Sequence, residues 1–384
     1  MINSNKINPY LSNLSITSIW SIGSFFINLL PIYFLNNNLY AELIVCTTTI
    51  FLLNQVLTLG LSDSILKYGN SILYLTLLLI LINSLVVNFF LDYKIVLGSL
   101  GLSSMITIRN YFVKNNLEHK LIKITFFIVL VRILASYFIL KNNFSIESYI
   151  IFLFLIPGLF ISITGLILIR STQNNLNLVI KKEILIFAIT TLISRFLFNY
   201  STRISIFILD NQKSYDELKI FGFLLSFLGV ISIINQSIRS VLIGKTSSDI
   251  SIAKEKFYLL VKKIKLFIPV NFIVSVVLSS VVYFSFSKIT LDSIVWNVEI
   301  IVLVFLFFTI HGFIIYSGLF NIFLRTINKI EIEIIMNLIR LLLIYLVGTI
   351  LHGIQFLIVY LFILFFVELI LAKISSHLLL NWKK

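Results

Sequence analysis

The residues with the most distinctive chemistry are arginines that stand inside long apolar segments. Arg132, Arg195 and Arg340 lie close to the centres of such segments, and Arg203 lies nearer the end of the segment that holds Arg195. An arginine keeps its proton under ordinary conditions, and its planar guanidinium binds phosphate or carboxylate oxygens through parallel hydrogen bonds. Arginines in this setting predict a binding site for an anion.

These arginines have two interpretations. In the first, each one hydrogen-bonds to backbone carbonyls and water and only braces neighbouring helices. In the second, they line a wet cavity, because a guanidinium in hydrocarbon costs at least about 2.5–3.5 kcal/mol. No aspartate stands at mid-segment, and we place Glu299 and Glu368 near segment ends, so we expect the positive charge to be uncompensated. The second interpretation is favoured, with the cavity lined by Arg132, Arg195, Asn199, Arg203 and Arg340.

Spacing extends this polar set along the chain. Arg195, Asn199 and Arg203 recur at every fourth residue, which places them along one face of a helix. Asn235 and Arg239 are one helical turn apart, and we expect them to continue the basic path to the cytoplasmic mouth of the cavity.

The motifs of an enzyme are missing from the sequence. There is no Walker A motif, no HExxH, no GxSxG and no acidic cluster in a loop, so we expect no catalytic residues, metal or cofactor. Cys46 is the single cysteine, which excludes an intramolecular disulfide. Transport must then draw on a gradient or on downhill disposal of the substrate. His311 could serve a proton-coupled step, although a lone histidine within such a segment more often only packs.

Composition identifies the setting of these residues. Of the 384 residues, 59% are hydrophobic and 12% are charged, and the mean hydropathy is +1.05. A soluble domain cannot hide that much apolar surface, so the sequence predicts an all-α polytopic membrane protein with about 12 transmembrane helices. We place the spans at 12–35, 42–61, 71–91, 95–113, 121–140, 148–169, 183–208, 217–241, 264–286, 295–318, 332–351 and 354–373.

The distribution of Lys and Arg predicts the orientation. Most of them fall in loops and helix ends on the side of the N-terminus, whereas the other side holds only Lys94, Lys141, Lys213, Lys219 and Lys288. Basic residues accumulate in cytoplasmic loops, so both termini are expected in the cytoplasm. The net charge of +14 follows from this topology and does not indicate binding to nucleic acid. Membrane lipids are expected to contact the basic loop at 242–263.

Similar segments in the two halves indicate an internal duplication. The sequence NYFVK at 110–114 matches NIFLR at 321–325, and 40–43 matches 215–218. A mid-membrane arginine with a tyrosine five positions later follows the first pair, as Arg132 with Tyr137 and Arg340 with Tyr345. We predict two pseudo-symmetric six-helix bundles around a central cavity, with bounds 1–174 and 183–384 and a cytoplasmic connecting segment at 175–182.

The sequence resembles the O-antigen and polysaccharide flippases, the Wzx-type members of the multidrug/oligosaccharidyl-lipid/polysaccharide exporter superfamily. The resemblance covers nearly the whole chain and is best over the first two spans, which end in 59–64 (LGLSDS), and over 187–236. Its motifs are diffuse, with no invariant catalytic string. One departure is Thr202, where relatives often carry Asp.

The resemblance implies a flippase that moves a polyprenyl-diphosphate-linked oligosaccharide, such as an O-antigen repeat unit, across the bacterial inner membrane by alternating access. It also implies the other membrane proteins of polysaccharide assembly as partners. The alternatives are an ion-coupled multidrug exporter or a lipid II-type exporter of the same superfamily. A membrane-embedded glycan polymerase is a further alternative, but the sequence lacks the sizeable outer loop on which such enzymes place their catalytic residues.

Overall fold

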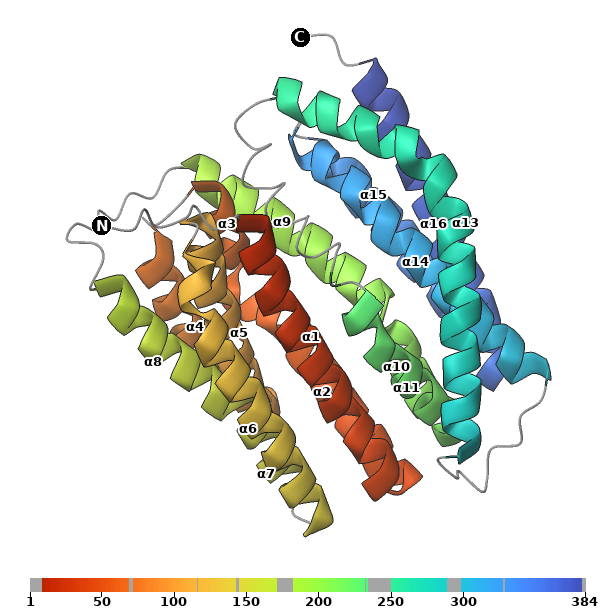
Figure 1. Ribbon diagram of the computed structural model, residues 1–384, viewed down its shortest axis with the longest axis horizontal. Coiled ribbons are helices and arrows are strands. Elements are labelled where there is room, and N and C mark those ends of the chain that lie inside the picture. Colours follow the sequence, from red (N-terminus) through yellow and green to blue (C-terminus); the bar gives the residue numbers. More distant parts are fainter. Residues whose placement is uncertain are drawn as a thin grey trace. The chain divides into compact units, whose positions relative to one another are not determined.

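The structure is a computed structural model that describes residues 9–68, 72–115, 117–142, 145–170, 182–231, 233, 250–288, 298–326 and 329–381. Within these ranges every regular element is a helix (Figure 1). Helices satisfy their backbone hydrogen bonds internally, which hydrocarbon surroundings demand because no water is present to do so. The all-α fold class predicted from the sequence is confirmed.

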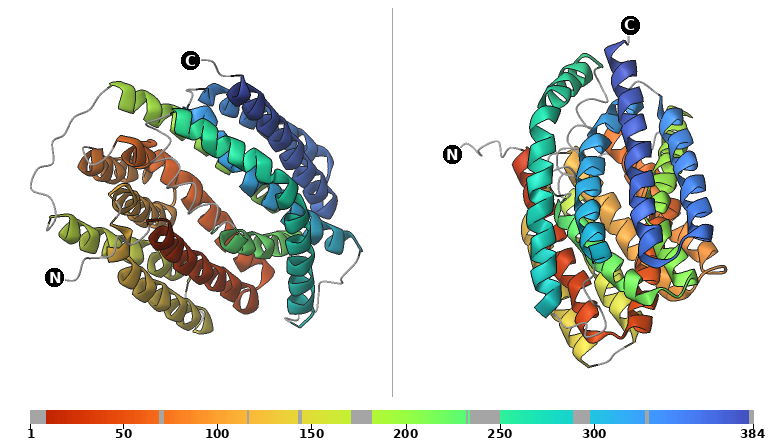
Figure 2. Two further views of the ribbon diagram at one scale, coloured as in Figure 1. Left: turned by 45° about the horizontal axis from the view of Figure 1, so that its top comes forward. Right: turned by 90° about the vertical axis from the view of Figure 1, so that its right-hand side faces the viewer.

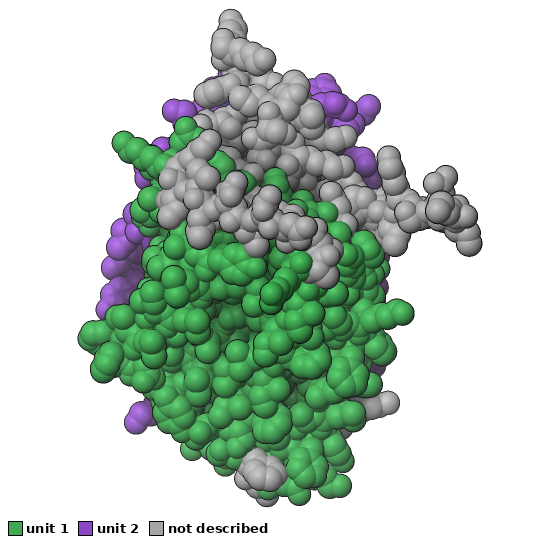
Figure 3. Space-filling model, turned by 90° about the vertical axis from the view of Figure 1, so that its left-hand side faces the viewer, with its two compact units in different colours: residues 1–196, 236–244 green, residues 197–235, 245–384 purple. Residues whose placement is uncertain are grey.

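The helices form two compact units, coloured separately in Figure 3. Among the described residues, those up to Phe196 belong to unit 1 and those from Leu197 onward belong to unit 2. The division falls within one helix, α9 (Lys182–Ser201). The predicted connecting segment lies outside the described residues except for Lys182, so the bundle bounds 1–174 and 183–384 remain predictions.

Unit 1 is organised around one central helix, α5. This helix packs against α2, α3, α4 and α8, and α1 lies along α6. In chain order the elements are α1 (Pro9–Phe34), α2 (Asn37–Thr58), α3 (Leu61–Tyr68), α4 (Leu73–Val87), α5 (Tyr93–Lys114), η2 (Glu118–Lys120), α6 (Ile122–Lys141), α7 (Ile146–Ile150), η3 (Ile151–Leu155), α8 (Ile156–Arg170) and the first part of α9.

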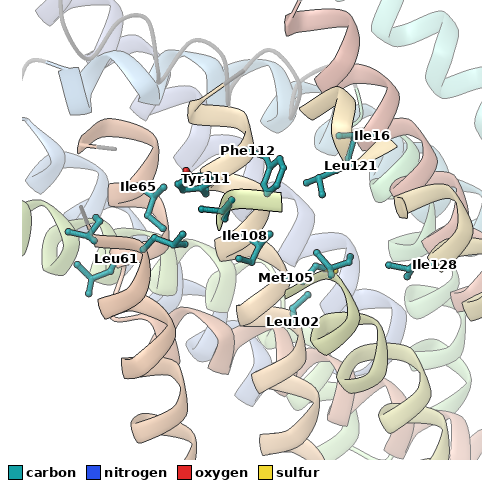
Figure 4. Packing of buried hydrophobic residues seen from close by; sticks show 14 of the residues in the cluster. Ile16, Leu61, Ile65, Leu102, Met105, Ile108, Tyr111, Phe112, Leu121 and Ile128 are labelled. Atoms are coloured by element: carbon teal, nitrogen blue, oxygen red, sulfur yellow. The ribbon is translucent and has the colours of Figure 1, made fainter. Parts of the chain in front are cut away.

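The apolar core of unit 1 follows from the periodicity of α5. Leu102, Met105 and Ile108 recur every third residue, so they share one buried face. Around them lie Ile65 from α3 and Ile16 from α1 (Figure 4). Other faces of α5 are buried as well, as expected for the central helix of the unit.

Glycines bring α5 and α8 into backbone contact. A Cβ atom built on Gly158 would lie 2.1 Å from the carbonyl oxygen of Gly101. Just before this crossing, η3 is a π turn. Pro157 has no N–H, and its ring crowds the carbonyl of Leu153, so a regular α-helix cannot run through this position. The predicted span 148–169 is therefore three successive elements.

Unit 2 is built around α14 and α16, which pack along each other, while α13 covers α14 and α15 covers α16. Figure 2 shows α13 (teal) bending along its length, and Pro269 lies within it. Besides the end of α9, the elements are α10 (Ile204–Asn211), α11 (Tyr215–Ile231), α13 (Ile250–Lys288), α14 (Val298–Thr326), α15 (Ile330–Ile350) and α16 (Gly353–Leu380).

Each of the twelve predicted spans has a helical counterpart among these elements. Eight of the described helices are long and apolar enough to cross a membrane. The seventh span differs from expectation, because 183–208 is broken into α9 and α10 at Thr202 and Arg203. Outward-facing side chains such as Leu85 and Phe89 are 69% and 87% exposed, which suits contact with lipid and not with water.

Candidate substrate-binding site

Arg132 occupies the middle of α6, on the face turned into unit 1. The opposite face of α6 exposes Phe126, Leu130, Leu134 and Phe138, so the apolar side of the helix faces outward and the polar side, with Arg132 and Ser136, is buried. Arg132 is only 4% exposed. Its guanidinium carbon lies 4.4 Å from the centre of the Trp20 ring of α1.

The guanidinium of Arg132 keeps open hydrogen-bond donors. Its Nε and Nη1 have no hydrogen-bond partner, and no carboxylate pairs with it within the described ranges. The π face of Trp20 stabilises a cation without consuming N–H donors, and Phe154 adds a second ring at 5.9 Å. For Arg132 the expectation of an uncompensated charge therefore agrees with the structure.

Hydrogen bonds hold the surroundings of Arg132 in place. Tyr149 of α7 donates its hydroxyl to the carbonyl of Ile27 at 2.8 Å, which ties α7 to α1. Ser136 donates to the carbonyl of Arg132 at 2.7 Å. The first bond joins α7 to the helix that carries Trp20, and the second stays within the helix that carries the arginine.

Arg340 is the equivalent arginine of unit 2, and here the expected lack of a carboxylate is wrong. Its Nη2 donates to Oε2 of Glu368 at 2.6 Å, and both side chains are fully buried. Ser317 of α14 donates to the other oxygen of Glu368 at 2.9 Å. The buried Nε and Nη1 of Arg340 have no hydrogen-bond partner in the described part of the chain, so the donors on these two nitrogens are unsatisfied.

Arg195 also has a carboxylate, contrary to expectation. Its Nη1 forms an ion pair with Oδ1 of Asp63, within unit 1. Asp63 stands on the short helix α3, which follows α2 after a turn at Leu59 and Gly60, both with positive φ. The pair therefore ties α3 to α9.

The other predicted site residues are less closely grouped. Asn199 lies on the last turns of α9, whereas Arg203 precedes α10 at the helix break, so the expected continuous polar face does not extend to it. Tyr360 of α16 donates to the carbonyl of Thr202 at this break, at 2.7 Å. Asn235 and Arg239 lie outside the described residues.

His311 of α14 is buried and engaged locally. Its Nδ1 lies 3.0 Å from the carbonyl oxygen of Phe307, one turn back, and its ring is 4.2 Å from the Phe307 ring. These contacts account for its packing, and a role in proton coupling stays a prediction.

The two units share a constellation that the sequence did not reveal. In each, an arginine on the fifth predicted span faces an aromatic ring of the first span of that half, Trp20 at 4.4 Å for Arg132 and Phe198 at 5.5 Å for Arg340. In each, a tyrosine of the sixth span, Tyr149 or Tyr360, donates to a carbonyl of that same first span. The tyrosines of the sequence repeat, Tyr137 and Tyr345, are instead exposed.

Solved structures resemble this arrangement of helices along nearly its whole length. The eukaryotic MATE transporter AtDTX14 matches with a TM-score of 0.63 over 96% of this chain and 94% of its own, at 13% identity. An outward-facing multidrug resistance MATE family transporter of the MOP superfamily matches with 0.63 over 99% and 98%, at 10% identity. The chain has the MATE transporter fold.

A third neighbour illustrates how function varies on this MATE fold. A MOP superfamily transporter from Pyrococcus furiosus Vc1 (DSM3638), whose reversed binding-pocket polarity suggests a different function, matches with a TM-score of 0.60 over 97% of this chain and 95% of its own, at 12% identity. No family model and no curated protein matches the chain. These three neighbours are transporters.

Proposed function

We propose that this chain is a flippase that moves a polyprenyl-diphosphate-linked oligosaccharide from the cytoplasmic to the outer leaflet of a bacterial inner membrane. The observation that carries the proposal is Arg132, a buried guanidinium with open donors and no carboxylate within the described ranges. The MATE fold supports the coarser part, an exporter of the MOP superfamily.

The chemistry of Arg132 favours an anionic cargo. A buried cation without a counter-ion is costly, so a ligand that brings negative charge gains binding free energy there. A diphosphate presents several oxygens to the Nε and Nη1 donors, and charge-assisted hydrogen bonds of this kind are about twice as strong as neutral ones. Trp20 offers a flat apolar surface beside the charge, which suits stacking of a sugar ring.

Arg340 contributes differently from Arg132. Glu368 neutralises its charge, so the pair adds little net potential, yet its unsatisfied Nε and Nη1 can still donate hydrogen bonds to polar groups of a glycan. Arg195 is likewise neutralised by Asp63. In this proposal Arg132 receives the diphosphate, while Arg340, Arg195, Asn199 and Arg203 serve the glycan or the framework that holds it.

An ion-coupled multidrug exporter is the second candidate. The buried carboxylates Asp63 and Glu368 favour it, because a cationic drug or a coupling cation needs a carboxylate inside the membrane. Both carboxylates are bonded to arginines, however, and a cationic drug would have to displace a guanidinium from them. The first helix, α1, carries no acidic residue. The anionic cargo is therefore favoured.

Loss of the chain tests the proposed direction and cargo. Cells that lack it should accumulate lipid-linked glycan on the cytoplasmic face of the inner membrane, and surface glycan should fall. Drug sensitivity should stay unchanged, which separates the flippase from the multidrug exporter. Unchanged surface glycan together with increased drug sensitivity would reverse the preference between the two.

A further inference from the structure

Glu118 is a buried acid that the proposed site does not use. It begins η2, the short helix between α5 and α6, and only 1% of the residue is exposed. No other residue among those described donates a hydrogen bond to its carboxyl oxygens. By contrast, the next residue, His119, is exposed to solvent.

Among the described residues, the elements packed against Glu118 supply a cation that acts on it. η2 contacts α1, α5 and α6. Helix α1 has no acidic or basic residue, and Lys123 of α6 is exposed. Lys114 of α5 and Lys120 of η2 are half-buried, and the cation that acts on Glu118 is Arg109 of α5.

The surroundings of Glu118 disfavour its ionised form. Burial raises the pKa of the Glu118 carboxyl to about 7, and its own backbone N–H and Arg109 oppose this rise only in part. Arg109 is engaged elsewhere, since its Nη2 donates to Thr17 of α1 at 2.6 Å. In this conformation the carboxyl therefore holds its proton at any pH below about 7.

We propose that Glu118 is a proton-binding site that couples transport to a proton gradient by controlling the junction of α1, α5 and α6. The protonated carboxyl fits the closed junction described here. When it ionises, it favours a state in which the junction opens and water or Arg109 stabilises the carboxylate. The same two helices, α1 and α6, carry Trp20 and Arg132, so opening this junction changes the geometry of the anion site.

The sign of the effect follows from linkage. The pKa of Glu118 is raised in the closed state relative to a hydrated carboxyl, whose pKa is about 4.3. The closed state is therefore favoured at low pH, and it loses stability as the pH rises from about 4.3 to about 7. Above about pH 7 the carboxyl is ionised in both states, so the free-energy difference between them no longer changes with pH.

The link to conformation can be measured without any substrate. In a Cys46→Ser background, Leu121→Cys places a thiol at a buried position next to η2, and Glu183→Cys gives an exposed reference thiol. The measured quantity is the maleimide labelling rate of the Leu121→Cys thiol divided by that of the Glu183→Cys thiol. This ratio cancels the intrinsic pH dependence of thiol reactivity. We expect this ratio to rise at least about tenfold between pH 5 and pH 8. Adding Glu118→Gln should keep the ratio low and flat, whereas Glu183→Gln added to the Leu121→Cys chain should leave its labelling profile unchanged.

A second measurement does not depend on the cysteine variants folding well. Infrared spectra of the native protein should show a protonated carboxyl band that titrates near neutral pH and is missing in Glu118→Gln. A flat labelling ratio in the otherwise native chain, or a native spectrum without such a titration, would overturn the proton site.

The link to transport rests on the proposed function. In vesicles containing an undecaprenyl-diphosphate-linked glycan, a pH gradient should accelerate flipping by the native chain but not by Glu118→Gln. Flipping that responds equally to the gradient in both proteins would refute the coupling while leaving the flippase intact. Absence of flipping in every protein would instead refute the flippase, and the substrate-free readouts would still decide whether Glu118 is a proton site.

Discussion

At the scale of single residues, the three central arginines differ in how their charge is balanced. Arg195 meets Asp63 and Arg340 meets Glu368, whereas Arg132 meets aromatic rings. The two ion pairs hold helices together, because separating the partners would leave a buried charge without a counter-ion. The ring contact of Arg132 leaves N–H donors for a ligand, so the same residue type serves different purposes.

The sequence located the arginines but misjudged their carboxylates, for a physical reason. The apolar run 354–373 predicts that Glu368 lies near a helix end. The helix α16 continues to Leu380, which puts Glu368 well inside it. Asp63 was placed beyond a span, but the positive-φ turn at Leu59 and Gly60 folds α3 back into unit 1 and buries it. Pairing between distant segments is not encoded in local periodicity.

The Arg340–Glu368 pair yields a stability prediction. Glu368→Ala should destabilise the protein by about 3–5 kcal/mol, because Arg340 would keep its charge in a buried site without a counter-ion. Replacing both residues with apolar ones of similar size should recover much of this loss. Asp63→Asn is the matched comparison and should cost less, since the Arg195 side chain is 22% exposed.

Thermal unfolding of the purified variants in one detergent checks this order. The single Glu368 variant should melt at the lowest temperature of the three. A Glu368→Ala protein as stable as the native chain would contradict the assigned role of the pair.

At the scale of elements, small residues decide how closely helices approach. Gly101 and Gly158 let α5 and α8 touch through their backbones, and Gly60 lies against the carbonyl of Ala188. The apolar runs predict the existence of the helices, but not all of their ends: α13 begins at Ile250 and not at 264, and α14 and α16 continue to Thr326 and Leu380. Glycines in a run mark candidate crossings, but which two glycines meet depends on the tertiary fold.

The α5–α8 crossing can be tested by adding a methyl group at the point of backbone contact. Gly158→Ala should destabilise the protein by about 1–3 kcal/mol or more, because the added Cβ would overlap the backbone of Gly101. Gly318→Ala is the control: a Cβ there meets nothing within 4 Å, and alanine favours the helix by about 0.5–1 kcal/mol. Melting temperatures should therefore fall for the first variant and stay level or rise for the second. Equal changes in melting temperature for the two variants would show that the α5–α8 backbone contact does not restrict the side chain at position 158.

At the scale of the whole molecule, the duplication predicted from short matches gains a structural counterpart. Each unit repeats an arginine, an aromatic ring and a tyrosine on corresponding helices, although few residues of the repeat are identical. Identity of 10–13% to solved MATE transporters likewise accompanies a shared fold. Helix packing tolerates exchange among apolar residues, so the architecture persists after the sequence has diverged. A shared fold does not identify the ligand, so what this chain binds has to be tested by substituting its own site residues.

The central claim is that Arg132 receives the diphosphate of a lipid-linked glycan. The most direct measurement is flipping of an undecaprenyl-diphosphate-linked glycan in vesicles that contain the purified protein. Arg132→Ala should slow flipping about 10- to 100-fold, as expected for loss of charge-assisted hydrogen bonds of about 1.5–3 kcal/mol. Arg132→Lys should be intermediate, and Arg170→Ala, which removes an exposed arginine, should match the native rate. Native-rate flipping by a folded Arg132→Ala protein would contradict the account.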